Sequence, residues 1–213
     1  MKLQLLLAVG LCVCSATSVH AAEPPPAESD AVDNAELRTL FDQDQNDRTA
    51  QEFDWVAINA RDTARRQRVD ELLRSGQIRT ANDYRHAAFV FQHGDDAAAY
   101  RLAHALATLA MTLDDSQQNR WIVAASWDRL LMSQLQPQWY GTQHKGDARG
   151  MYLYPVAADA VSDKERQRMI GITLDEVRTR GMQRATDSGL KIRQPAPTID
   201  ELRAEANAAK PKD

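Results

Sequence analysis

Cysteine is nearly absent from this chain of 213 residues, which has two, Cys12 and Cys14, both close to its start. From residue 15 onward the chain therefore offers no disulfide, no thiol nucleophile and no thiolate ligand for a metal ion. A domain formed by the later residues has to be held together by its packed core.

A surplus of basic residues is also lacking, as are the signatures of several large enzyme classes. Lys and Arg number 26 against 30 Asp and Glu, which gives a net charge of −4. Nucleic-acid-binding proteins usually carry a basic surplus, so we expect no nucleic acid partner. The chain has no Gly-x-Ser-x-Gly elbow, no phosphate-binding loop and no dinucleotide fingerprint, and we expect no cofactor.

Long apolar runs are missing except at the N-terminus. Lys2 precedes an apolar run over residues 3–13, and Val19 and Ala21 stand at the −3 and −1 positions of a cleavage site. This pattern predicts a signal peptide over residues 1–21, and hence a periplasmic or secreted protein with no membrane span after cleavage. A lipoprotein is the alternative, but bulky residues precede both cysteines where a lipobox needs a small one.

Composition divides the remaining residues into a linker, a core domain and a tail. Residues 22–36 are rich in Pro and acidic side chains, as in an extended linker. Every aromatic residue lies between Phe41 and Tyr154, and aromatic side chains carry large buried areas. We therefore predict a helical domain within 37–186 and a flexible tail over 187–213, in which a short helix near the end would have little to bury.

Hydrophobic periodicity and capping signals predict a series of helices. They cover residues 55–74, 80–92, 96–113 and 117–134, and two shorter ones begin after Ser162 and Thr173. The helix over 96–113 is apolar almost all round, so we expect it to be buried on most sides. In the first helix Asp62 falls on the apolar side, and an ion pair with Arg66 four residues later is the simplest explanation.

Two aromatic, β-prone stretches follow the long helices, at residues 138–143 and 151–156. A polar loop with Gly146 and Gly150 separates them, which predicts a two-stranded hairpin that lies on the helices. Short connections make consecutive helices antiparallel neighbours. The predicted fold class is therefore mainly α, an antiparallel helical-hairpin bundle with a small β-hairpin appended.

Two ionisable residues are candidates for chemistry. Asp128 lies on the apolar face of its helix, so its carboxylate needs a buried partner. It is either a carboxylate with a perturbed pKa in a cleft, or a structural group that pairs with a residue such as Arg129 or anchors loop amides. His93 ends a helix, where the dipole stabilises a protonated imidazole. His86 lies roughly 10 Å from His93 on that helix, too far to share a metal ion, and no metal site is expected.

The segment from Tyr140 to Gln143 is more polar than a plain strand. Gly141 permits a close backbone approach or an unusual dihedral angle. Tyr140, Thr142 and Gln143 supply hydroxyl and amide groups that suit a polar ligand. The alternative is a polar plug that fixes the hairpin to the helices, and the sequence favours neither interpretation.

Three short motifs occur in order along the helical region: Gln92-His93-Gly94, Trp127-Asp128-Arg129 and Gln138-Trp-Tyr-Gly-Thr-Gln143. Over residues 50–180 they resemble a bacterial family of small, mostly helical domains of unknown function, with a Gln-His pair, an Asp-Arg pair and a Gln-x-Tyr-Gly-Thr-Gln signature. No activity comes with this resemblance. Trp139 stands where the family often has a smaller apolar residue, which affects the shape of any pocket. The resemblance implies one cluster of His93, Asp128, Arg129, Tyr140, Gly141, Thr142 and Gln143.

The expected function is a binding or protein-interaction module, because the helical architecture carries no catalytic signature. Its partner would be an unknown protein or a small polar ligand in the cell envelope. One alternative is a hydrolase of a cell-envelope substrate, with His93 or Asp128 as general base and Tyr140 or Thr142 positioning the substrate. That alternative needs these side chains to converge in an open cleft. The other alternative is a scaffold with no site.

Overall fold

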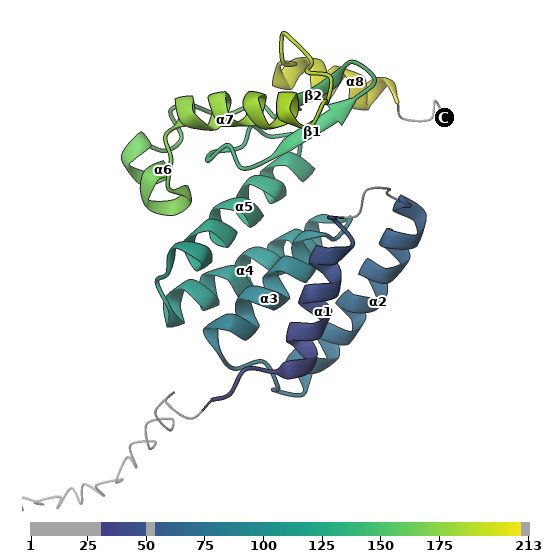
Figure 1. Cartoon of the computed structure of the whole chain (residues 1–213), viewed down its shortest axis with the longest axis vertical. Helices are drawn as coiled ribbons and strands as arrows, with labels where there is room; N and C mark the ends of the chain where they lie inside the picture. Colours follow the sequence, from purple (N-terminus) through teal and green to yellow (C-terminus); the bar gives the residue numbers. More distant parts are fainter. Residues whose placement is uncertain (1–30, 50–53, 210–213) are drawn as a thin grey trace, which may run out of the picture. The chain divides into compact units, whose positions relative to one another are not determined.

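The computed structural model describes residues 31–49 and 54–209. The signal peptide predicted over 1–21 and most of the linker predicted over 22–36 lie outside these residues. The described part is mainly helical with a small β-hairpin, as predicted (Figure 1). The elements are α1 (Ala35–Asn46), α2 (Trp55–Arg74), α3 (Ala81–Gln92), α4 (Ala97–Leu113), α5 (Gln117–Ser133), β1 (His144–Asp147), β2 (Gly150–Leu153), α6 (Asp163–Ile170), α7 (Leu174–Asp187) and α8 (Ile199–Ala208).

Capping side chains mark the start of several helices. Thr80 accepts a hydrogen bond from the backbone N–H of Asp83, and the Asp83 carboxylate accepts one from the Thr80 N–H. Thr173 and Glu176 make the same reciprocal pair before α7. Each pair satisfies two backbone donors that have no partner within the helix. The capping signals therefore predict the first residues of α3 and α7 correctly.

The apolar core lies among α1 to α5. α3 packs against α4, α4 against α5, and α1 against α3 (Figure 1). Small side chains allow α3, α4 and α5 to approach closely. The alanines of these three helices with no exposed surface in this core are Ala87, Ala88, Ala103, Ala107 and Ala124.

α4 is buried along one stripe rather than on most sides, so that prediction is wrong. Its buried residues are Ala103, Leu106, Ala107 and Ala110. Leu109 and Leu113 are 46% and 37% exposed. α4 contacts α3 and α5, and these two contacts leave its remaining face exposed to solvent.

α1 is a helix absent from the sequence-based prediction. Asn34 caps it by accepting a hydrogen bond from the Leu37 N–H. Its fully buried residues are Leu37 and Asp44, and the remaining surface is mostly polar. Leu40 packs against the core and Phe41 stacks on His86, so with Leu37 they form an apolar stripe at helical spacing that sequence reasoning missed.

The β-hairpin is present, but its strands differ from the predicted ones. β1 and β2 pair antiparallel, with His144 opposite Leu153 and Asp147 opposite Gly150. Gly146 and Gly150 lie in the strands, and the stretch 138–143 makes only an isolated bridge, between Gln138 and Val156. The first predicted strand is therefore wrong, because backbone N–H groups of 138–143 donate to buried side chains instead of to a neighbouring strand.

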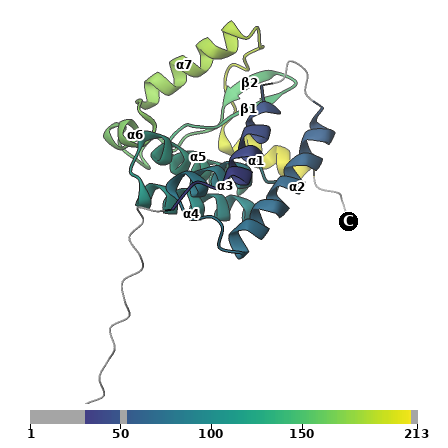
Figure 2. The same cartoon turned by 60° about the horizontal axis from the view of Figure 1, so that its bottom comes forward.

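The residues after α7 pack against the hairpin, whereas the composition predicts a flexible tail from residue 187. The N–H of Met151 in β2 donates to Lys191 O at 2.7 Å, and the Arg193 N–H donates to Met151 O at 2.9 Å. α8 follows and buries Leu202 against Tyr152 and Tyr154. Figure 1 shows α8 beside the hairpin, and Figures 1 and 2 both show α7 along the hairpin. The expectation fails because the partners of this segment are distant in sequence.

Candidate functional site

Asp128 of α5 is fully buried and holds the segment that leads to the hairpin. One carboxylate oxygen accepts from the N–H groups of Trp139 and Tyr140, at 2.8 and 3.0 Å. The other accepts from the N–H and the hydroxyl of Thr142, at 3.0 and 2.9 Å. Burial raises the pKa of Asp128, and these four hydrogen bonds oppose that rise. The carboxylate thus anchors loop amides, one of the two interpretations that the sequence leaves open.

Two glutamines complete this anchor. The Gln138 side chain donates to the backbone oxygens of Gln143 and Tyr154 and accepts from the Gln143 N–H. The Gln143 side chain donates to Ala125 O of α5 and to Thr142 Oγ1. Both glutamine side chains are buried. The side chains of Thr142 and Gln143, two of the three predicted to bind a ligand, are therefore used to fix the segment to α5.

Gly141 lies in the same segment with φ of +88°, in the left-handed region. A Cβ atom here would lie 3.0 Å from Val177 Cγ1 of α7, so the position excludes a side chain for two reasons. The predicted need for glycine at this position is confirmed. It serves close packing against α7.

His93 and Arg129 belong to a different group of contacts. His93 is the C-cap residue of α3, and its Nδ1 lies 3.0 Å from both carboxylate oxygens of Asp44 in α1. Burial lowers the pKa of His93, although the hydrogen bond with Asp44 acts in the opposite direction. Among the described residues, no hydrogen bond or ion pair joins His93 or Arg129 to Asp128 or to the segment 140–143.

Asp44 belongs to a charged cluster between α1 and α2 that sequence reasoning missed. The cluster joins three aspartates to three arginines: Asp44, Asp47 and Asp62 with Arg48, Arg61 and Arg65. Arg48 Nη2 lies 2.8 Å from Asp62 Oδ2, and Arg65 Nη2 lies 2.8 Å from Asp47 Oδ2. Burial acts to raise the pKa of Asp62, but the two arginines that bind it outweigh this and lower it. The predicted partner, Arg66, instead donates to the backbone oxygen of His93.

Arg129 differs from the arginines of that cluster because it has no carboxylate partner within 4.0 Å among the described residues. Its Nε is buried and makes no hydrogen bond there. Its nearest favourable electrostatic neighbour is the hydroxyl of Tyr100, whose proton is donated to Gly94 O at 2.7 Å. Burial is the main reason why the pKa of Arg129 is lowered.

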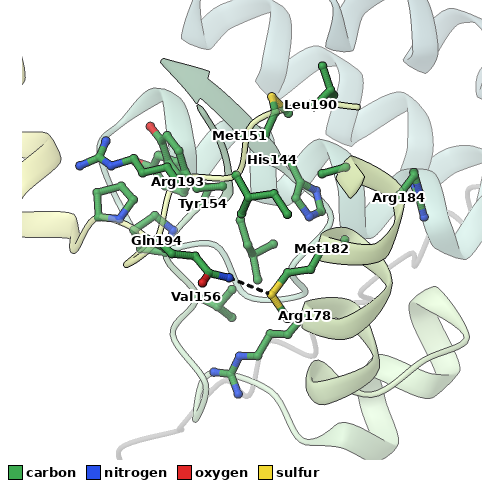
Figure 3. Close-up of a pocket in the computed structure, with 18 of the residues that line it drawn as sticks. His144, Met151, Tyr154, Val156, Arg178, Met182, Arg184, Leu190, Arg193 and Gln194 are labelled. Carbon is green, nitrogen blue, oxygen red and sulfur yellow. Dashed lines mark hydrogen bonds between the residues drawn. The ribbon is translucent and has the colours of Figure 1, made fainter. Parts of the chain in front are cut away.

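A cavity of about 580 Å³ lies between the hairpin, α7 and the residues that follow α7 (Figure 3). This volume is within the range of pockets that hold small molecules. Most of its lining is apolar. The apolar side chains that line it are Met151, Leu153, Pro155, Val156, Met182, Ala185, Leu190, Ile192, Ala196 and Pro197.

A few polar groups interrupt the apolar lining of this cavity. Figure 3 shows His144 of β1 pointing toward α7, where a Cβ atom at Gly181 would lie 2.4 Å from its Nε2. Burial lowers the pKa of His144, and the positive charge of Arg184 adds to this effect. Tyr154 also lines the cavity, and its hydroxyl is buried without a hydrogen-bond partner in the described structure. Arg178 and Arg184 of α7 add positive charge.

This cavity is not predicted from the sequence. Its walls come from the hairpin, α7 and a segment expected to be a tail, so no single stretch of sequence contains it. One signal was available: Gly181 in the middle of a helix, where glycine is unfavourable unless something packs closely against it. Met182 and Leu190, which are 44% and 50% exposed, are a second signal once the fold is known.

Two other kinds of site are absent from the part of the chain that the structure describes. Its His, Cys, Asp and Glu side chains nowhere form a group of three or more suited to hold a metal ion. None of its helices combines the length and apolar character needed to cross a bilayer. No family model, curated protein or solved structure matches the chain.

Proposed function

We propose that the protein is a binding module of the bacterial cell envelope whose cavity beside α7 holds an apolar molecule with one acidic group. The N-terminal sequence supports the periplasm or the exterior as its location. The observation that carries the proposal is the cavity itself. It combines apolar walls, a volume suited to a small ligand and only a few polar groups, the usual composition of a small-molecule site.

The acidic group follows from the charges around the cavity. Arg184 makes no ion pair within the described structure, and the ion pair of Arg178 with Asp175 is exposed and therefore weak. With its lowered pKa, His144 is neutral at pH 7 and adds no charge. An anionic group near α7 would be favoured over a cationic one, while the apolar part of the ligand would contact Met151, Leu153 and Met182.

The alternative roles have less support. A hydrolase with Asp128 as general base would need a free carboxylate oxygen, and each oxygen of Asp128 already accepts two hydrogen bonds. A scaffold with no site would have no use for a cavity of this size. We therefore prefer ligand binding, with the Asp128 anchor as part of the frame that holds the hairpin.

Calorimetric titration with dodecanoate, below its micelle concentration, tests the proposal. Dodecyltrimethylammonium is the control ligand, since it has the same chain and the opposite charge. We expect dodecanoate to bind with a Kd at least about tenfold lower than that of the cation, a difference of about 1.4 kcal/mol. Absence of binding by both compounds, or equal binding of the two, would contradict the proposed ligand class.

Two pairs of variants locate the binding. Ala185→Trp fills the cavity from α7 and should abolish binding, whereas Ala98→Trp, at an exposed position of α4, should bind as the parent does. Arg184→Gln should weaken the binding of dodecanoate about tenfold without weakening the binding of the cation. Arg180→Gln is the matched control, because Arg180 is exposed on the same helix and does not line the cavity. Unchanged binding by Ala185→Trp would place the ligand elsewhere.

A further inference from the structure

Arg129 is a mostly buried cation whose charge nothing nearby compensates in the described structure. Asp44, which contacts His93, is already bound by Arg48. Asp95, which lies near Tyr100, pairs with Arg66. Arg48 carries a like charge that disfavours the charged form of Arg129. An arginine cannot readily lose its proton to escape this cost. A buried guanidinium without an anionic partner is therefore expected to recruit one from solution.

The groups around Arg129 are arranged to receive such a partner. Arg129, His93 and Tyr100 each keep some exposed surface, and Arg129 interacts electrostatically with both His93 and Tyr100, so the three side chains lie close together. Because an ionised carboxylate only accepts hydrogen bonds, the contact with Asp44 places the proton of neutral His93 on Nδ1. Its Nε2 is then an acceptor. Arg129 offers donors, and His93 offers a lone pair beside them.

We propose that Arg129 and His93, with the hydroxyl of Tyr100 beside them, form a binding site for monohydrogen phosphate. The charged phosphate oxygens accept hydrogen bonds from the guanidinium, and this pairing is strong because both partners are charged. A P–OH group donates to Nε2 of His93. Sulfate and acetate have no proton to donate at neutral pH, so they would leave that acceptor unpaired. This inference does not rest on the cavity beside α7, which is lined by other residues.

Titration of the ¹⁵N-labelled full chain at pH 8 tests the site, with phosphate, methyl phosphate, sulfate and acetate compared at constant ionic strength. The Nε–H resonance of Arg129, assigned by its loss in Arg129→Lys, should shift with phosphate. Phosphate should bind at least about tenfold more tightly than sulfate, because a site built for a hydrogen bond rejects a ligand that lacks it. Methyl phosphate at pH 8 is a dianion without a P–OH group, so it should bind as weakly as sulfate, and a preference for it over phosphate would contradict the hydrogen bond to His93. An Nε–H resonance that none of the four anions shifts would overturn the proposal.

Variants separate binding from a merely structural role. Arg129→Gln should lose the rise in Tm that phosphate gives the parent, while Arg101→Gln, at an exposed position of α4, should keep it. His93→Gln should keep phosphate binding but lose the preference over sulfate, because its amide can also donate to sulfate. If Arg129→Gln lowers Tm equally with and without phosphate, Arg129 is structural and the proposal fails.

Discussion

The Asp128 side chain of α5 accepts hydrogen bonds from the backbone of three residues, Trp139, Tyr140 and Thr142, and from the Thr142 hydroxyl. In Asp128→Asn the new NH₂ group would face the Thr142 N–H and hydroxyl, or the N–H groups of Trp139 and Tyr140, so two donors would lose their acceptor in a buried place. We expect the free energy of unfolding to fall by about 2–4 kcal/mol. Urea unfolding of the parent and the variant measures this.

The control for this experiment is Asp200→Asn. The Asp200 side chain is 86% exposed on α8. The free energy of unfolding of Asp200→Asn should therefore stay within about 0.5 kcal/mol of that of the parent. Equal stability of Asp128→Asn and the parent would mean that the four hydrogen bonds contribute nothing to the fold. The carboxylate would then need another explanation, such as a function.

His86 should make the stability depend on pH. Its ring is 2% exposed and stacks on Phe41, with ring centroids 4.3 Å apart. Burial, then the charges of Arg85 and Arg38, lowers its pKa to about 4. Between pH 6.5 and 4 the unfolded chain binds a proton that the folded protein does not, so stability is lost as the pH falls through this window.

The size of this effect can be measured against His86→Leu. The parent should lose about 2–3 kcal/mol more than the variant between pH 7 and pH 4.5 in urea unfolding, since each pKa unit corresponds to about 1.4 kcal/mol. Other groups titrate in the same range, but they are common to both proteins and cancel in the comparison. Equal losses would show that the imidazole is protonated in the folded state.

Residues on helix faces could be identified from the sequence better than their partners could. The burial of Asp128 and of Asp62 follows from their place on apolar stripes, and both are buried. Several partners lie 11 to 14 residues away in the chain, as for Trp139 and Thr142 with Asp128 and for Arg48 with Asp62. Helical spacing indicates only neighbours three or four residues away, and it does not decide between Arg65, which binds Asp62, and Arg66, which does not.

At the level of elements, the long helices were predicted because periodicity and caps agree there. α2 spans Trp55–Arg74, as predicted, and α3 ends at Gln92. α1, the strand boundaries and the packed residues after α7 were not predicted. The strand boundaries and the packed residues depend on contacts between distant segments: the segment 138–143 with Asp128, and Ile192 with Met151. The cavity depends on these two arrangements, and for that reason it was not predicted either.

α8 offers a test of whether the C-terminal residues belong to the folded domain. Leu202 is 7% exposed and packs against Tyr152 and Tyr154 of the hairpin. Leu202→Ala should lower the free energy of unfolding by about 2–3 kcal/mol, the usual cost of removing a buried leucine side chain. Leu190→Ala, at a position that is 50% exposed, should cost far less. Equal and small effects of the two substitutions in urea unfolding would support the flexible tail that composition suggests.

For the whole molecule, the two proposed sites should act independently. They share no residue, and each ligand stabilises the folded state according to its own concentration and Kd. We expect the increases in unfolding free energy with dodecanoate and with phosphate to add within about 0.5 kcal/mol when both are present. Urea unfolding with each ligand and with both measures this. A sum that departs by more would show coupling, or that both ligands occupy the same site.

The pairing of β2 with residues 191–193 has a further consequence for the behaviour of the protein in solution. A bare strand edge presents unpaired N–H and C=O groups that can recruit the same strand of another molecule. The bonds of Met151 with Lys191 and Arg193 occupy that edge within the chain. A protease that cuts between α7 and residue 191 and releases the C-terminal fragment would therefore leave the N–H and C=O groups of this β2 edge unpaired. The truncated protein would then tend to aggregate through this edge.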